Sequence, residues 1–140
     1  MKQYRIDPSK GLEFGIYTLG DHLPNPLTGE RISAQERVQE IIEYAKLADE
    51  AGIDFFSVGE SHQEYFATQA HSVVLGAIAQ ATKNIKIASS STIISTSDPV
   101  RVYEDFATID LISNGRAEIV AGRASRVGLF DLLGYDIRHY

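Results

Sequence analysis

The sequence contains no cysteine and no long uninterrupted apolar run. The absence of cysteine excludes disulfides, thiolate catalysis and cysteine-ligated metal sites. No segment approaches the roughly 18 continuous apolar residues that indicate a membrane-spanning helix. The first residues, MKQYRIDPSKG, also lack the apolar stretch of a secretory signal peptide. The sequence therefore predicts a cytoplasmic protein that does not associate with membranes.

Basic clusters are also missing, and the net charge of the chain is −6. An acidic chain is not steered toward nucleic acid or an anionic membrane, so neither is expected as a partner. What is present is an ordinary globular composition, 44% hydrophobic and 23% charged, in 140 residues. Such a length corresponds to about one domain with a substantial core. Since no linker interrupts it, residues 1–140 are expected to belong to a single domain.

Strand and helix signals alternate along the chain. Short runs rich in β-branched and aromatic residues predict four strands, at residues 12–18, 55–58, 85–89 and 117–120. Apolar residues at helical spacing predict helices at about 33–52, 70–82 and 98–114, with a short one near 131–134. This alternation is typical of an α/β fold with right-handed crossovers. The strands are expected to be parallel, adjacent in chain order and covered by helices on one face.

Specific capping signals mark the helix boundaries. Ser33 followed by Glu36 forms a capping box, and Gly52 suits the C′ position of the same helix. Asp98 before Pro99 supplies an N-cap with proline in the first turn of the third helix. These signals fix where two of the helices begin.

The predicted connections differ in length between the two ends of the sheet. Helix-to-strand turns are only a few residues long, whereas the strand-to-helix loops at 19–32, 59–69 and 92–97 are longer. In a parallel sheet these longer loops all leave from the carboxyl edge, where α/β proteins bind ligands. Because long loops in compact domains are usually functional, the sequence predicts a binding site at that edge.

Five segments together carry a resemblance to a known family: residues 55–62, 85–92, 98–101, 114–116 and 122–123. Their order and spacing closely resemble the luciferase-like flavin monooxygenases, a (β/α)8-barrel family that includes the bacterial luciferase subunits. The resemblance covers nearly the whole chain. It implies an α/β fold of the TIM-barrel type, of which this chain supplies about the first four βα units, since a full barrel needs about 250 residues.

Four strands alone would leave both edges of the sheet open. The resemblance therefore implies that either further units of the same chain or a second assembled half completes the barrel. In family members the second half largely holds the flavin phosphate, so that part of the binding site is expected outside this sequence.

The resemblance implies a flavin-dependent monooxygenase that uses reduced FMN and O2 to oxidise a small organic substrate. A separate flavin reductase and further copies of the chain are the partners it implies. Because reduced flavin reacts with oxygen itself, the protein has to orient the ring, exclude water and place the substrate. The alternatives are an F420-dependent hydride-transfer oxidoreductase of the same superfamily, a non-catalytic flavin-binding or structural barrel homologue, and an unrelated (β/α)8 lyase or isomerase.

Ser61 and His62 are the candidate catalytic residues. Many relatives carry Glu-His-His where this chain has Glu60-Ser61-His62, so Ser61 replaces the first histidine of the family. The replacement argues against luciferase-type light emission and leaves an imidazole and a hydroxyl for proton transfer. His62, rather than Glu60, is expected to be the titratable group nearest the flavin ring. The alternative is a solvated or structural histidine.

Four residues at the ends of the third and fourth strands are the candidate flavin-binding groups: Ser90, Ser91, Gly122 and Arg123. Family members commonly have a non-proline cis peptide bond at the position that Ser90-Ser91 matches. Small side chains here would let the flavin ring lie against the strand, and Gly122 would permit its close approach. The alternatives are local backbone capping by the serines and a tight strand exit at Gly122, with Arg123 bonded to a carboxylate.

The remaining polar residues predict less. His22 and His71 have no partners at metal-ligand spacing, so no metal site is expected. Arg101 and Asp105 are expected to form a solvated i,i+4 ion pair. The segment 63–66 is expected either to line the substrate pocket or to anchor an aromatic loop on the barrel rim.

Overall fold

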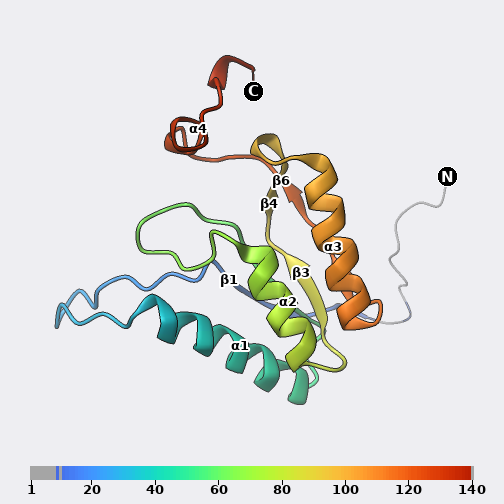
Figure 1. The fold of residues 1–140 in the computed structure, drawn as a ribbon. Helices are drawn as coiled ribbons and strands as arrows, with labels where there is room; N and C mark the ends of the chain where they lie inside the picture. The colour runs from blue at the N-terminus through green and yellow to red at the C-terminus, as the bar shows by residue number, and fades with distance from the viewer. Residues whose placement is uncertain (1–8, 10, 140) are drawn as a thin grey trace.

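The computed structural model describes residue 9 and residues 11–139, and its centre is a four-stranded parallel sheet (Figure 1). The strands follow one another in chain order: β1 (Gly15–Thr18), β2 (Phe55–Val58), β3 (Lys86–Ser89) and β5 (Ala117–Glu118). The helices between them are α1 (Ala34–Glu50), α2 (His71–Ala81) and α3 (Pro99–Ser113). The predicted α/β fold with parallel, sequentially ordered strands is confirmed.

Shorter elements lie toward the carboxyl ends of the strands. β4 (Thr92–Ile93) pairs in parallel with β6 (Ala121–Gly122), and a 3₁₀ turn, η2 (Ile94–Thr96), leads into α3. The chain then continues into α4 (Gly128–Leu133) and a second 3₁₀ turn, η3 (Ile137–His139). Within the described residues, no helix combines the length and the apolar character that crossing a membrane requires.

The three long helices cover one face of the sheet, as predicted. α1 packs on α2 and α2 packs on α3, and all three share one continuous core with the sheet (Figure 1). The strands contribute Phe56, Val58 and Ile87, which are almost fully buried. The helices contribute Ile41, Ala45 and Ala48 of α1, Val74, Leu75, Ile78 and Ala79 of α2, and Ile109 of α3. This core holds the carboxyl ends of the strands at a common edge.

The predicted caps of α1 and α3 are present. The Ser33 hydroxyl accepts a hydrogen bond from the Glu36 amide at 3.1 Å, and the Glu36 carboxylate accepts one from the Ser33 amide at 2.8 Å. Gly52 has a positive φ of 75° after the end of α1, as expected at C′. The Asp98 carboxylate accepts hydrogen bonds from two backbone amides in the first turn of α3.

The prediction of one strand at 117–120 is wrong, because the chain forms β5 and β6 with a break at Ile119 and Val120. At the break, the Ser89 hydroxyl accepts a hydrogen bond from the Val120 amide at 3.0 Å and donates one to its carbonyl at 3.3 Å. A side chain thus replaces the backbone ladder where β3 ends. The predicted loop at 92–97 likewise contains β4 and η2.

Two smaller predictions also need correction. The first strand begins at Gly15, not at residue 12, since its partner β2 begins at Phe55 and the register pairs these two residues. Arg101 forms its ion pair with Glu104, at 2.8 Å, and not with Asp105 as predicted. The i,i+3 neighbour on the exposed face of α3 takes the guanidinium instead of the i+4 neighbour.

Candidate active site at the carboxyl edge of the sheet

A cavity of about 440 Å³ lies at the carboxyl edge of the sheet. Its lining comes from Leu19 after β1, residues 60–63 after β2, Ile93 of β4, and parts of the segment 125–132 after β6. Small-molecule sites typically have volumes of about 300–1,000 Å³ and apolar walls with a few polar groups. This cavity fits that description, and it lies where the loop lengths predicted a site.

Both candidate catalytic residues line this cavity. The His62 side chain is 18% exposed, and its Nε2 atom lies 2.7 Å from Oε1 of Glu60. Ser61 is buried beside it. The site thus combines an imidazole, a carboxylate and a hydroxyl, which are groups that can exchange or share a proton at neutral pH.

Glu60 connects the end of β2 to the neighbouring strand segment. Its carboxylate is 8% exposed, and Oε2 accepts a hydrogen bond from the Ile93 amide at 2.7 Å. Its own amide donates to the Ser91 carbonyl at 3.2 Å. Since a buried carboxylate needs hydrogen-bond partners, these contacts make Glu60 a fixed part of the site.

His71, at the start of α2, belongs to the same cluster, which the sequence did not indicate. Its Nε2 atom lies 2.8 Å from the Thr92 hydroxyl, and its Nδ1 atom lies 3.8 Å from Oε2 of Glu60. Burial lowers the pKa of His71, against the opposing effects of the negative charges of Glu60 and Asp105. Among the described residues, no three acidic or histidine side chains are gathered as ligands for a metal ion.

The Ser90–Ser91 peptide bond is cis, as predicted. Two glycines make room for this segment: a Cβ atom on Gly59 would overlap the Ser90 carbonyl, and one on Gly122 would overlap the Ser91 hydroxyl. The space beside Gly122 is therefore filled by Ser91, in keeping with the strand-exit interpretation of that glycine. Arg123 follows Gly122 in the chain, but the arginine that lines the cavity at the carboxyl edge is Arg126.

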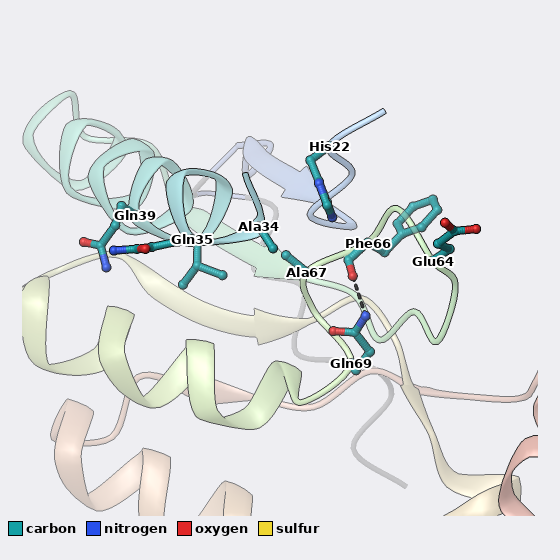
Figure 2. Close-up of a pocket in the computed structure, with 9 residues that line it drawn as sticks. His22, Ala34, Gln35, Gln39, Glu64, Phe66, Ala67 and Gln69 are labelled. Carbon is teal, nitrogen blue, oxygen red and sulfur yellow. Dashed lines mark hydrogen bonds between the residues drawn. The ribbon is translucent and has the colours of Figure 1, made fainter. Parts of the chain in front are cut away.

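A second cavity, of about 500 Å³, lies between the start of α1 and the loop after β2 (Figure 2). Gln35 and Gln39 of α1, with Phe66 and Gln69 of the loop, are among the residues that line it, and the Gln69 amide donates to the Phe66 carbonyl. The buried His22 also lines it, and its Nδ1 atom has no hydrogen-bond partner among the described residues. This cavity contains no carboxylate–imidazole pair like that of Glu60 and His62.

The side chains of the segment 63–66 have different surroundings. Gln63 lines the cavity at the carboxyl edge. Tyr65 instead packs edge-on against His22, at 6.4 Å between ring centroids, and carries the Arg31 guanidinium 5.1 Å from its own ring centroid. Tyr65 therefore anchors the loop, as in the second alternative, whereas Phe66 lines the second cavity.

The sequence profile of one family, described as luciferase-like monooxygenase, matches residues 12–140. The chain belongs to this family. It is 30% identical to N-acetyl-S-alkylcysteine monooxygenase of Bacillus subtilis over 73% of this chain and 31% of that protein. It is 31% identical to the alkanal monooxygenase beta chain of Vibrio harveyi, over 75% and 31% of the two chains. The chain thus spans about a third of the length of these relatives.

Solved structures show the same fold. The oxygenating constituent of 3,6-diketocamphane monooxygenase from Pseudomonas putida, in complex with FMN, superposes with a TM-score of 0.78 at 21% identity, over 91% of this chain and 34% of that one. The coenzyme F420-dependent tetrahydromethanopterin reductase of Methanopyrus kandleri superposes with a TM-score of 0.65 at 26% identity, over 89% and 30%. The predicted α/β fold with a parallel sheet matches that of these neighbours, and the described four-stranded sheet is not closed into a barrel.

Proposed function

We propose that this chain forms part of a flavin-dependent monooxygenase that uses reduced FMN and O2 to oxidise a small organic substrate. The observation that carries the proposal is the cavity at the carboxyl edge, with Glu60 and His62 in its wall, in a chain of the luciferase-like family. Two relatives that are 30% and 31% identical to this chain are named monooxygenases, and a solved structure of the same fold is in complex with FMN.

The described residues suit a flavin ring at this edge. The lining combines apolar walls, such as Leu19, Ile93 and Leu129, with a few polar groups. A flat, mostly apolar ring with polar edges needs that combination. When bound, reduced flavin supplies electrons to oxygen. Ser90 and Ser91 would hold the ring against the strand end, and Gly122 of β6 and Arg123 after it would support that segment.

His62 is the group proposed to move a proton. It lies in the cavity wall and is held by a carboxylate, whereas the Ser61 hydroxyl beside it would donate or accept a hydrogen bond. Glu60 is already committed to His62 and to the Ile93 amide. His62 is therefore the better placed of the two titratable groups for contact with the flavin or the substrate.

We further propose that residues 1–140 supply the first four βα units of a single barrel, which further units complete. The four strands follow one another without a reversal of order, and both outer strands of the described sheet have a free edge. A separate reductase would deliver the reduced flavin. The FMN-bound neighbour is itself named as the oxygenating constituent of a larger system, which supports such a division of labour.

An F420-dependent hydride transfer is the second candidate. An F420-dependent reductase shares the fold at 26% identity, and Ser61 stands where many monooxygenase relatives carry a histidine. Absorption and fluorescence titration of the complete purified protein with FMN and with F420 separates the two. Saturable binding of FMN alone, followed by O2-dependent reoxidation of the bound flavin after its reduction with dithionite, supports the monooxygenase. Binding of F420 alone supports hydride transfer, and binding of neither contradicts both.

The proton-transfer role of His62 is tested by His62→Ala. Because a placed acid or base contributes about 10²- to 10⁴-fold, oxidation of the organic substrate should slow by at least about tenfold. FMN affinity should change by less than about threefold, since proton transfer and cofactor binding are separate tasks. Unchanged turnover would make His62 a structural residue and transfer the role to Ser61 or to groups outside this chain segment.

A further inference from the structure

Glu60 is the most constrained charged group in the described part of the site. Its Oε1 atom lies 2.7 Å from His62 Nε2, and its Oε2 atom lies 2.7 Å from the Ile93 amide nitrogen. The side chain is 8% exposed, so water contributes little to its solvation. A carboxylate in such a place is stable only when its oxygens are used, and here each oxygen has a partner.

These contacts determine which nitrogen of His62 carries a proton. A carboxylate can only accept hydrogen bonds, and the Ile93 amide can only donate one. With Oε2 bonded to that amide, Oε1 is the acceptor for His62, so Nε2 of the ring must carry the hydrogen. In a neutral imidazole the other nitrogen is then unprotonated. Nδ1 of His62 becomes the basic atom.

The surroundings fix Glu60 from the opposite side as well. His71 Nδ1 lies 3.8 Å from Oε2, too far for a hydrogen bond but close enough to face the carboxylate. The ring of His71 is itself held by the Thr92 hydroxyl at 2.8 Å. A third cavity, of about 290 Å³ and lined by His71, Thr92 and Asp105, lies on this side of Glu60. Glu60 thus stands in the wall between two cavities.

We propose that Glu60 is a positioning residue for His62: its carboxylate accepts the Nε2 hydrogen of the ring and so makes Nδ1 the atom that exchanges a proton in the cavity. The catalytic meaning of this assignment rests on the proposed function, because a proton has to be exchanged with a bound flavin or substrate. The assignment of the tautomer itself is independent of the proposed function, because it depends only on contacts within the chain.

Nitrogen-15 NMR of the histidine-labelled complete protein, without flavin, tests the proposal. At a pH where the His62 ring is neutral, the Nε2-protonated tautomer should dominate, and the Nε2 proton should resonate downfield with slow exchange, as for an imidazole held by a carboxylate. His62→Gln assigns the signals. A dominant Nδ1-protonated His62 ring, or an Nε2 proton in fast exchange with water, would overturn the proposal.

Glu60→Gln supplies the matching variant. Glutamine offers one accepting oxygen to two donors, the Ile93 amide and the His62 ring, so the ratio of the two tautomers should fall by about tenfold, the effect of one charge-assisted hydrogen bond. Glu64→Gln is the control: it removes a carboxylate from the same loop, but one that lines the cavity between α1 and this loop. It should leave the His62 signals unchanged. An unaltered ratio in a folded Glu60→Gln protein refutes the role of Glu60.

The His62 tautomer measured by NMR does not depend on which cofactor the protein binds. If the tautomer shifts as expected but neither FMN nor F420 binds, the positioning stands and the proposed function fails. If FMN binds and the tautomer ratio does not respond to Glu60→Gln, the function stands and Glu60 is only structural.

Discussion

Two glycines show how single residues shape the candidate site. A Cβ atom on Gly59 would overlap the backbone carbonyl of Ser90, and the equivalent atom on Gly122 would overlap the side chain of Ser91. Neither glycine therefore offers open space to a ligand. Both let the strand ends approach the Ser90–Ser91 segment closely, which places the serines at the edge where the cavity lies.

Replacement of Gly59 by alanine should destabilise the protein. The new methyl group would meet a backbone atom that cannot rotate away, and overpacking of this kind typically costs about 1–3 kcal/mol. Gly76→Ala is the matched control: Gly76 lies inside α2 with nothing within 4 Å of an added Cβ atom, so alanine should stabilise by about 0.5–1 kcal/mol. Urea unfolding of both variants measures the difference, and equal stabilities would contradict the close packing at Gly59.

The sequence placed some of these residues correctly and missed others. Ser61 and His62 were expected at the carboxyl edge because they directly follow a predicted strand, and both line the cavity. His71 could not be found in this way, because it begins a helix and meets Glu60 only through the fold. Glu60 adjoined the predicted site in sequence, but its bond to the Ile93 amide joins residues 33 positions apart, which no local pattern can signal.

At the scale of whole elements, local signals predicted the helices well and the strand ends poorly. Caps such as those at Ser33 and Asp98 are encoded within a few residues, so they can be recognised in the sequence. The break between β5 and β6 depends instead on Ser89, which lies far away in the sequence. Long-range hydrogen bonds of this kind also hold the turns at the opposite, amino edge of the sheet.

Asp49, near the end of α1, stabilises the turn between α2 and β3. Its carboxylate accepts hydrogen bonds from the amides of Lys83 at 2.7 Å, Asn84 at 2.9 Å and Ile85 at 2.7 Å. Asp49→Asn has only one accepting oxygen, so it should lose about 1–3 kcal/mol of stability near neutral pH. Chemical unfolding measures this loss, with Glu50→Gln, at the exposed next position, as the control.

The effect of Asp49→Asn should depend on pH. Burial opposes ionisation of Asp49, but the three backbone amides, together with the positive charge of Arg116, outweigh it and hold the pKa of its carboxyl below the usual value. A lowered folded-state pKa stabilises the protein above the unfolded-state value, near 4, and this contribution is lost as the pH falls through the folded-state pKa. The stability difference between the two proteins should therefore shrink as the pH falls below the unfolded-state value, near 4. A difference that stays constant or grows there would contradict this account.

Arg116, in the Asn114-Gly115-Arg116 turn, joins α2 to α3. Its guanidinium donates to the carbonyls of Ser113, Ala79, Thr82 and Ile85 and to the Thr82 hydroxyl, at 2.7–3.0 Å. The segment 114–116, one of the five that carry the family resemblance, therefore stabilises the fold at the edge of the sheet opposite the cavity.

Lysine cannot replace the planar, five-donor group of Arg116, so Arg116→Lys should cost about 1–3 kcal/mol. The control Arg101→Lys changes an exposed side chain that forms an ion pair with Glu104, and its stability should stay within about 0.5 kcal/mol of the parent. Thermal unfolding compares the two. Similar losses for both substitutions would show that the bonds of Arg116 are not what stabilises the turn.

Over the whole molecule, the apolar residues left on the surface gather partly at the two open edges of the sheet. Leu12, Phe14 and Tyr17, in and before β1, are 82%, 65% and 55% exposed, and Ile119 and Val120, beside β5, are 46% and 50% exposed. An open strand edge with apolar side chains pairs readily with another chain. The complete barrel proposed above would cover both edges, and the relatives are long enough to supply it, since the matched region is about a third of each.

The 140-residue chain prepared by itself should therefore associate in solution. Sedimentation velocity at increasing concentration should show a shift from monomer to larger species, because strand pairing across the free edge of β1 buries side chains such as Tyr17. Tyr17→Lys places a charge at that edge and should raise the concentration needed for association by about tenfold. Leu27→Lys removes a 93% exposed apolar side chain from a loop away from both edges and should have no such effect. If the chain stays monomeric at all concentrations, or if both substitutions change its association equally, the open strand edges do not drive association. The exposure of these edges would then no longer support completion of a barrel.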